Sequence, residues 1–251
     1  MRLRRGNAII FHLKDSRGDF SVKSYLFPRV NREGRRFGLV AFTLAFLYLA
    51  GTVAVGVVCP AAGAAMGLFV LPLFLVAWGV VLFFRDPERF PPDDPKAVLS
   101  PADGRVCMVE RCELPQELGG GGSRWRVSVF MSVMDVHVNR MPAAAQVMRL
   151  VHVPGRFLNA ALDKASSENE RCCYLMRTDE GTEYGVVQIA GLVARRIVPF
   201  VKEGDRLGTA ERFGLIRFGS RLDVYLPEGV EPEVRPGQTM RSGETVIGHM
   251  K

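Results

Sequence analysis

Four short segments of the chain contain polar residue types that support catalysis. They are Phe84-Arg-Asp-Pro-Glu-Arg, Ser100-Pro-Ala-Asp-Gly, Met134-Asp-Val-His-Val-Asn-Arg-Met-Pro and Leu215-Ile-Arg-Phe-Gly-Ser-Arg-Leu-Asp-Val-Tyr-Leu-Pro. Taken singly, each has an ordinary structural explanation. Ser100–Gly104 has the composition of a β-turn, His137 between two valines is typical of a hydrogen-bonded core residue, and Gly219-Ser220 between apolar strands suggests a bulge.

Together and in this order, the four segments resemble the phosphatidylserine decarboxylase family, in particular its short, archaeal-type (type A) form. The resemblance runs from Phe84 to roughly Gly248, and the stretch Phe-Gly-Ser-Arg-Leu-Asp-Val-Tyr-Leu-Pro is highly specific. It implies that the precursor cleaves itself between Gly219 and Ser220. A large chain, residues 1–219, and a small chain, residues 220–251, then stay associated as a heterodimer, and Ser220 becomes a pyruvoyl group at the new N-terminus.

The residue types suit the chemistry that the resemblance implies. The Ser220 hydroxyl can attack the Gly219 carbonyl to form an ester, and glycine accepts the strained backbone that brings the two together. His137 titrates near neutrality and is the candidate base, while Asp103 would orient its imidazole as in a Ser-His-Asp triad. Elimination and hydrolysis then give the pyruvoyl group and ammonia. We therefore expect Asp103, His137 and Ser220 to converge in space.

In turnover, the resemblance implies a Schiff base between the pyruvoyl ketone and the amine of phosphatidylserine, loss of carbon dioxide and formation of phosphatidylethanolamine. The pyruvoyl group fills the electron-sink role of pyridoxal phosphate, so neither pyridoxal phosphate nor a metal is expected. His137 is the first candidate for returning a proton to the substrate carbon. Longer relatives carry a second histidine where this chain has Arg140, so a division of labour between two histidines does not transfer.

Arginines are the candidates for binding the lipid phosphate or carboxylate, because a guanidinium group forms bidentate hydrogen bonds with both. Arg140 and Arg221 are the tentative substrate-binding residues, and Arg85 is a further candidate. Arg89 is expected to be a solvated surface residue.

The elements that position these residues begin with a membrane anchor. No Asp, Glu, Lys, Arg or His occurs from Phe37 to Phe84, and this run is too long for one crossing of about 20 residues. Cys59-Pro60 divides it, since proline disfavours helix at the preceding residue. We expect a transmembrane hairpin of Phe37–Val58 and Ala61–Phe84. The alternatives are a re-entrant hairpin in one leaflet and helices buried within the protein.

The whole net charge of +7 lies in residues 1–36, in front of this hairpin. A nucleic-acid-binding protein would carry such charge on a folded domain. Here the charge favours anionic membrane lipid, at about 1 kcal/mol per basic residue near the surface. The positive-inside rule keeps the segment cytoplasmic, and two crossings then place residues 85–251 on the cytoplasmic face of the inner membrane.

Residues 85–251 are predicted to form one catalytic domain that is mainly β, a β-rich α+β fold with one helix at Gly155–Ala165. Turn glycines in Val201-Lys-Glu-Gly, Val234-Arg-Pro-Gly and Ser242-Gly-Glu repeat a pattern similar to the barrel-sandwich fold of biotinyl and lipoyl domains. A nucleotide-binding fold is disfavoured, because no phosphate-binding glycine motif occurs. Strands are expected at Arg105–Cys112, Arg124–Ser132, Gln146–Val153, Cys172–Thr178, Glu183–Ala190, Arg195–Val201, Gly214–Phe218 and Leu222–Leu226.

Two other functions stay open at this level. A membrane-anchored serine hydrolase would use the same three residues, although the Gly-x-Ser-x-Gly elbow is absent. A non-catalytic lipoyl-like scaffold would need a lysine at a hairpin tip, for which Lys202 is the candidate. The five cysteines contain no C-x-x-C pair, which indicates reduced thiols in a cytosolic compartment. Homo-oligomerisation beyond the two processed chains is left open.

Overall fold

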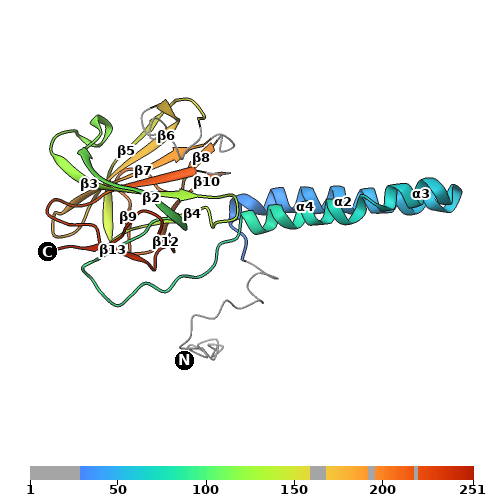
Figure 1. Cartoon of the computed structure of the whole chain (residues 1–251), viewed down its shortest axis with the longest axis horizontal. Coiled ribbons are helices and arrows are strands. Elements are labelled where there is room, and N and C mark those ends of the chain that lie inside the picture. Colours follow the sequence, from blue (N-terminus) through green and yellow to red (C-terminus); the bar gives the residue numbers. More distant parts are fainter. Residues whose placement is uncertain (1–28, 159–167, 192–195, 218–219) are drawn as a thin grey trace, which may run out of the picture.

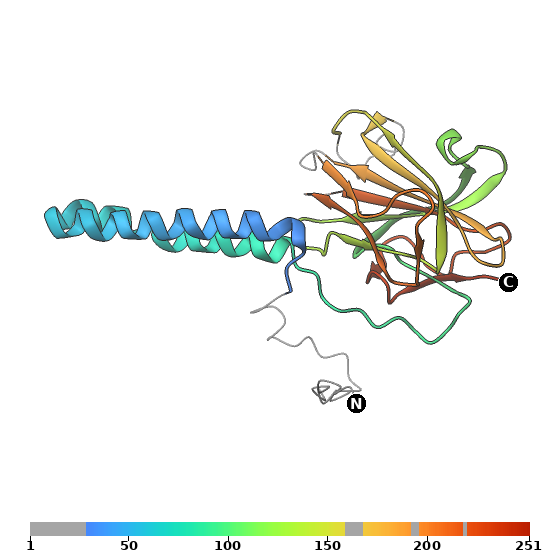
Figure 2. The same cartoon turned by 180° about the vertical axis from the view of Figure 1, so that it is seen from behind.

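A helical rod projects from one end of a β-rich domain, as both views show (Figures 1 and 2). The computed structural model describes residues 29–158, 168–191, 196–217 and 220–251. The basic segment up to residue 28, most of the expected helix 155–165, and Gly219 lie outside the described residues.

The uncharged run forms a helical hairpin. It consists of α2 (Arg32–Val58), α3 (Pro60–Gly67) and α4 (Val70–Phe83). By length and composition, Arg32–Val58 and Pro60–Phe83 can each cross a membrane. Asn31 caps α2 through its Oδ1, which accepts a hydrogen bond from the Glu33 N–H at 3.0 Å. Cys59 is extended (φ −137°, ψ 92°) before Pro60, so the predicted break in the hairpin is confirmed.

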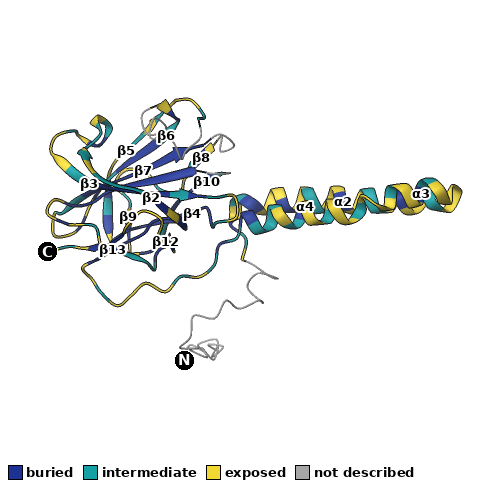
Figure 3. Ribbon diagram, in the orientation of Figure 1, coloured by how far each residue is buried: buried dark blue, intermediate teal, exposed yellow. Residues whose placement is uncertain are grey.

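Most residues of the hairpin are exposed or half-buried (Figure 3). Only 11% of the apolar window in each candidate span is buried, and Leu47, Leu68 and Val57 are 64%, 75% and 81% exposed. The alternative that these helices are buried within the protein is therefore wrong for the described residues. An apolar surface of this extent fits a lipid environment rather than water.

The β domain consists of three antiparallel sheets. The largest sheet has the strand order β12 (Thr239–Met240), β2 (Gly104–Glu113), β3 (Ser123–Met131), β11 (Ser220–Tyr225), β7 (Glu183–Ala190), β6 (Arg171–Arg177), β5 (Ala145–Val153) and β9 (Arg206–Leu207). The smaller sheets are β4 (Val138–Arg140), β10 (Arg212–Arg217) and β8 (Arg196–Pro199), and the pair β1 (Ala97–Leu99) with β13 (Val246–His249). A short 3-10 helix, Gln116–Leu118, lies between β2 and β3.

The mainly β prediction is confirmed, and the expected strands agree with those observed to within about two residues at each end. The prediction of a helix at Gly155–Ala165 is wrong for its first four residues, which are the part of it that the structure describes. Residues 155–158 are not helical, because Arg156 instead pairs with the chain that returns at Asn169. The Arg156 N–H donates to the Glu168 carbonyl at 2.7 Å, and the Glu170 N–H donates to the Arg156 carbonyl at 3.0 Å.

The repeated turn glycines make the same backbone contacts at two places in the domain. Gly204 and Gly237 both have φ of +90°. The N–H of Gly204 donates to the Val147 carbonyl at 2.8 Å, and the N–H of Gly237 donates to the Val106 carbonyl at 2.7 Å. Both valines lie at irregularities in the strand register. The repeated pattern in the sequence therefore corresponds to a repeated clamp of a turn on a bulged strand.

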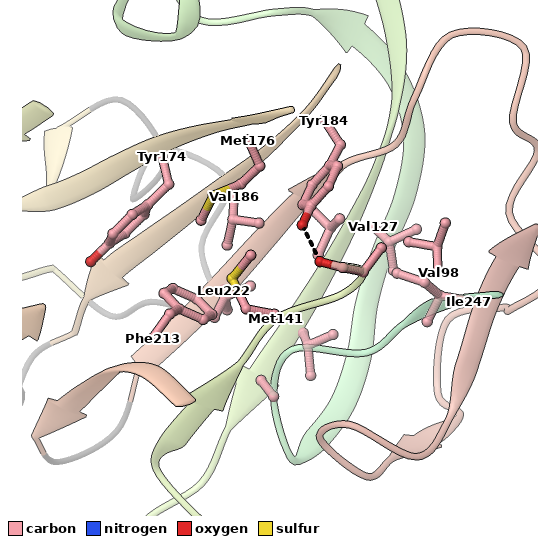
Figure 4. Packing of buried hydrophobic residues seen from close by; sticks show 14 of the residues in the cluster. Val98, Val127, Met141, Tyr174, Met176, Tyr184, Val186, Phe213, Leu222 and Ile247 are labelled. Carbon is pink, nitrogen blue, oxygen red and sulfur yellow. Dashed lines mark hydrogen bonds between the residues drawn. The ribbon is translucent and has the colours of Figure 1, made fainter. Parts of the chain in front are cut away.

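The main core receives side chains from all three sheets. Val127, Val186 and Leu222 come from the centre of the large sheet, and Phe213 comes from β10 (Figure 4). The buried Tyr184 hydroxyl donates to the Ala143 carbonyl at 2.7 Å, so this polar group is satisfied within the core. The core fixes the position of β11, the strand that begins with Ser220.

Gly104, which ends the Ser100–Gly104 segment, lies tightly against β3. Its φ is +139°, and a Cβ at this position would lie 2.1 Å from the Phe130 carbonyl oxygen. Glycine is therefore needed twice over, for the backbone conformation and for the close approach.

Gly104→Ala is expected to destabilise the full chain by roughly 3 kcal/mol, because backbone strain and overpacking add. This corresponds to a fall in Tm of roughly 10 °C in a detergent-solubilised thermal melt. Gly121→Ala is the matched control, since Gly121 also has positive φ (+77°) but nothing within 4 Å of a Cβ. Equal shifts for the two variants would show that the contact with Phe130 is unimportant.

Candidate active site

Ser220 is the first residue of the central strand β11, which has a partner strand on both sides. It lies opposite Met131 of β3 and Ala190 of β7. The residue has no solvent exposure, and its Oγ has no hydrogen-bond partner in the described structure. A buried hydroxyl left unpaired costs about 1–3 kcal/mol, so the arrangement needs an explanation beyond packing. The predicted cleavage partner, Gly219, lies outside the described residues.

Alternation along β11 separates its residues between two faces of the sheet. Ser220 shares a face with Leu222 and Val224, which belong to the main core. Arg221 and Asp223 therefore point to the opposite face. Ser220 thus faces the interior between the sheets.

A chain of buried polar side chains approaches Ser220 on this face. The Tyr174 hydroxyl donates to Gln188 Oε1 at 2.6 Å, and Gln188 Nε2 donates to Asn139 Oδ1 at 2.7 Å. Asn139 Nδ2 is 3.6 Å from the Met131 sulfur, and Met131 is the cross-strand partner of Ser220. Sequence reasoning did not single out these residues. The available signal was Gln188, a polar residue within the otherwise apolar part of its strand, residues 185–190.

His137 is fully buried at the junction of the β domain and the hairpin. Its ring centroid is 4.2 Å from that of Phe83, the last residue of α4. Its backbone carbonyl accepts a hydrogen bond from the Ile216 N–H at 3.3 Å in β10. The hairpin therefore contacts this histidine directly, which places the imidazole at the end of the domain from which the hairpin projects.

The environment of His137 favours a neutral base. Its Nδ1 is 2.9 Å from the Asp135 carbonyl oxygen. Since a carbonyl only accepts, Nδ1 carries the proton, and Nε2 of the neutral ring has the lone pair. Burial lowers the pKa of His137 to about 4, against a smaller opposing effect of the Asp135 carbonyl. The imidazole is therefore neutral at pH 7 and able to accept a proton.

Asp103 lies in the loop between β1 and β2, held by two contacts. Its Oδ2 accepts from Arg89 Nη2 at 2.6 Å, and its Oδ1 accepts from the Ser242 N–H at 2.7 Å. Burial raises the pKa of Asp103, and the Arg89 charge partly opposes this effect. The strand that follows, β2, has Arg105 opposite Phe130 of β3, and Phe130 lies opposite Arg221 of β11, so Arg105 is two strand spacings or about 10 Å away from the residue next to Ser220.

The orienting contact on the His137 imidazole thus comes from a backbone carbonyl, that of Asp135. Both carboxylate oxygens of Asp103 accept hydrogen bonds from other groups. The convergence of Asp103, His137 and Ser220 on one reacting atom stays a prediction.

The expectation that Arg89 is a solvated surface residue is wrong. Its side chain is only 3% exposed, and it contacts both Asp103 and Glu244, the latter at 3.6 Å. The loop after the hairpin folds back onto the segment around Ser242, and this tertiary contact removes the arginine from water. Arg89 is therefore part of the support of Asp103.

The two tentative substrate-binding arginines are held in buried ion pairs. Arg221 binds Asp223 through two parallel hydrogen bonds of 2.6 and 2.9 Å. Arg140 donates to Asp86 at 2.9 Å and to the Ala210 carbonyl at 3.1 Å. Substrate binding by either guanidinium group would require these pairs to open. Arg85 donates to the Leu82 carbonyl at 2.9 Å and to the Met134 carbonyl at 2.5 Å.

The described ranges contain no group of three or more His, Cys, Asp or Glu side chains placed to hold a metal ion.

Comparison with known proteins identifies a family. The family model described as phosphatidylserine decarboxylase matches residues 76–248. A relative from Erythrobacter litoralis is 49% identical over 236 residues, covering 89% of this chain and 88% of the relative. One from Novosphingobium aromaticivorans is 46% identical over 246 residues, covering 94% and 92%. One from Ruegeria pomeroyi is 56% identical over 170 residues, covering 67% and 78%. All three carry the name phosphatidylserine decarboxylase proenzyme.

The buried His137 makes stability depend on pH in a defined direction. An unfolded histidine has a pKa of 6.5, whereas the folded value is about 4, so between these values only the unfolded chain binds the proton. The contribution is complete above pH 6.5 and is lost as the pH falls toward 4, by about 3 kcal/mol.

Thermal melts of the full chain should show this as a loss of roughly 6–12 °C in Tm beyond that of His137→Gln over the same pH range. If both proteins lost stability equally on acidification, His137 would not be the buried neutral group described here.

Proposed function

The chain belongs to the phosphatidylserine decarboxylase family, and we propose that it is made as a proenzyme that cleaves its own backbone between Gly219 and Ser220. The enzyme is a carboxy-lyase, a phosphatidylserine decarboxylase. Family membership over residues 76–248 displaces the serine hydrolase and the scaffold as alternatives. The observation that carries the proposal is the Ser220 hydroxyl, which is buried in a strand paired on both sides and has no partner in the described structure.

In the first step of processing, Ser220 Oγ attacks the carbonyl carbon of Gly219. His137 accepts the hydroxyl proton at Nε2, and the amide nitrogen takes a proton as the C–N bond breaks. The product is an ester between residue 219 and the side chain of Ser220. The paired β11 holds the backbone of Ser220 in place, so the hydroxyl and not the strand has to move.

In the second step, removal of the Cα proton of residue 220 expels the carboxylate of Gly219 and leaves a dehydroalanine. Addition of one water and loss of one ammonia convert this residue to a pyruvoyl group. The small chain 220–251 is then lighter than the corresponding serine peptide by one ammonia.

The pyruvoyl group supplies a ketone that takes up the amine of phosphatidylserine and accepts the electron pair when carbon dioxide leaves. The surrounding residues exclude water from this carbonyl, since Ser220, Met131 and Ala190 are all buried. In turnover His137 returns a proton to the substrate carbon to give phosphatidylethanolamine. Because the imidazole is neutral at pH 7, the proton that it returns must first be accepted at Nε2, and the ammonium group of the substrate, which loses its protons as the amine condenses with the ketone, is the source.

The proposal also assigns the location and the assembly. Residues 37–84 anchor the enzyme in the inner membrane, with residues 1–36 and the catalytic domain 85–251 on the cytoplasmic side. The contact of Phe83 with His137 supports a site at the lipid surface.

After cleavage the small chain retains β11, β12 and β13, which pair with β3, β7, β2 and β1 of the large chain. The two chains therefore stay associated as a heterodimer.

Ser220→Ala should give one uncut, inactive chain on denaturing electrophoresis, whereas the wild-type protein should run as two. Ser128→Ala is the matched control, because Ser128 is also a buried serine whose hydroxyl has no partner in the described structure, on the adjacent strand. It should cleave normally. Cleavage of Ser220→Ala, or failure of both variants to cleave, would contradict the assignment of the nucleophile.

Two variants test separately which residue is the base and which residue orients it. His137→Gln removes the proposed base, and Asp103→Asn removes the carboxylate that was expected to orient it. Loss of the base should slow self-cleavage by roughly 10²- to 10⁴-fold. Asp103→Asn should slow it less, because the Asp135 carbonyl still orients the imidazole. The rates are measured from the appearance of the small chain after synthesis in vitro. An equally severe defect in Asp103→Asn would show that this carboxylate is the orienting group after all.

A further inference from the structure

A cavity of about 500 Å³ lies where the chain enters and leaves the helical hairpin. The entering and leaving segments are joined by hydrogen bonds, from the Asn31 N–H to the Phe84 carbonyl at 2.9 Å and from the Asp86 N–H to the Arg29 carbonyl at 2.6 Å. The wall is completed by the first residue of β10. The lining residues are Arg29, Val30, Asn31, Arg32, Arg35, Asp86 and Arg212.

The cavity is strongly basic. Four arginines line it against a single carboxylate, that of Asp86; one of them, Arg29, is paired with Glu88, which does not line the cavity. The Asp86 carboxylate is already paired with Arg212 at 2.6 Å and with Arg140 at 2.9 Å, so it does not neutralise the remaining charge. Arg32 and Arg35 make no ion pair within the described ranges, and both are exposed toward the cavity.

The depth of the cavity matches the headgroup layer of a bilayer. The uncharged run begins at Phe37, so at 1.5 Å per helical residue Arg35 and Arg32 lie roughly 3 and 8 Å outside it. The headgroup region extends about 5–8 Å beyond the hydrocarbon core on each side. The arginines therefore lie at the level of the lipid phosphates if the hairpin crosses the membrane as proposed.

We propose that this cavity binds the phosphodiester of an anionic phospholipid at a site distinct from the catalytic centre. Guanidinium groups bind phosphate through bidentate hydrogen bonds, and the N–H groups at the start of α2 add positive potential. Neither Ser220, His137 nor Asp103 lines the cavity. A lipid held here ties the base of the hairpin to β10 and fixes the catalytic domain against the membrane.

Two kinds of lipid carry such an anionic phosphodiester headgroup: the substrate phosphatidylserine, and lipids that are not decarboxylated, such as phosphatidylglycerol. The inference rests on the proposed membrane insertion but not on decarboxylation. Binding is therefore measured on the uncut Ser220→Ala full chain, delipidated in detergent, by native mass spectrometry with phosphatidylglycerol, phosphatidylserine or zwitterionic phosphatidylcholine.

Each lost guanidinium removes charge-assisted hydrogen bonds to the phosphate, so Arg35→Gln should weaken retention of phosphatidylglycerol about tenfold, and Arg32→Gln with Arg35→Gln roughly 100-fold. Arg36→Gln is the matched control: it removes the same charge at the next position, and Arg36 does not line the cavity. Retention in this control should stay within about twofold of the parent. If Arg35→Gln and Arg36→Gln weakened lipid retention equally, retention would depend on net positive charge and not on the cavity, and the proposal would be overturned.

The choice of lipid gives a second test. Similar retention of phosphatidylglycerol and phosphatidylserine supports a general anionic site. Retention of phosphatidylserine alone, or of phosphatidylcholine as well as phosphatidylglycerol, overturns it. Normal decarboxylation by wild-type enzyme that fails to retain phosphatidylglycerol would refute this site and leave the proposed function intact.

Discussion

The proposed reaction depends on how the fold holds the backbone and the hydroxyl of Ser220. Its backbone is fixed by β3 on one side and β7 on the other, while its hydroxyl, in a dry interior, has no partner in the described structure. A protein under selection for stability alone would pair this group or replace it with an apolar one. Ser128 on β3 shares the buried, unpaired hydroxyl, but Ser220 also begins its strand directly after Gly219, the position that the proposed self-cleavage requires of a nucleophile.

The helical hairpin and the proposed catalytic base meet at His137. Phe83 at the end of α4 covers the imidazole, and burial keeps it neutral near pH 7. If the hairpin spans the bilayer as proposed, the same contact sets the height of His137 above the membrane, because α4 ends there. In the proposed mechanism, packing of the hairpin on the β domain then controls both the protonation state of the base and its distance from a lipid headgroup.

The hairpin and the long strands can be predicted from local patterns in the sequence. The hairpin and its break at Pro60 follow from hydrophobicity and from the restriction before proline, and long strands such as Glu183–Ala190 follow from their β-branched composition. Short strands such as Val138–Arg140 were missed, because three residues carry no periodic signal. Burial of Arg89 and the orientation of His137 by a carbonyl depend on tertiary contacts between distant segments, which a single sequence does not contain.

The central claim is that Ser220 becomes a carbonyl group at the start of the small chain. The most direct measurement is intact mass of the small chain after wild-type enzyme is mixed with phosphatidylserine and reduced with cyanoborohydride. The account predicts that the fragment 220–251 gains an amine adduct at its first residue, which peptide mapping locates. An unmodified fragment with a free amino terminus, or an adduct on a lysine elsewhere, would contradict it.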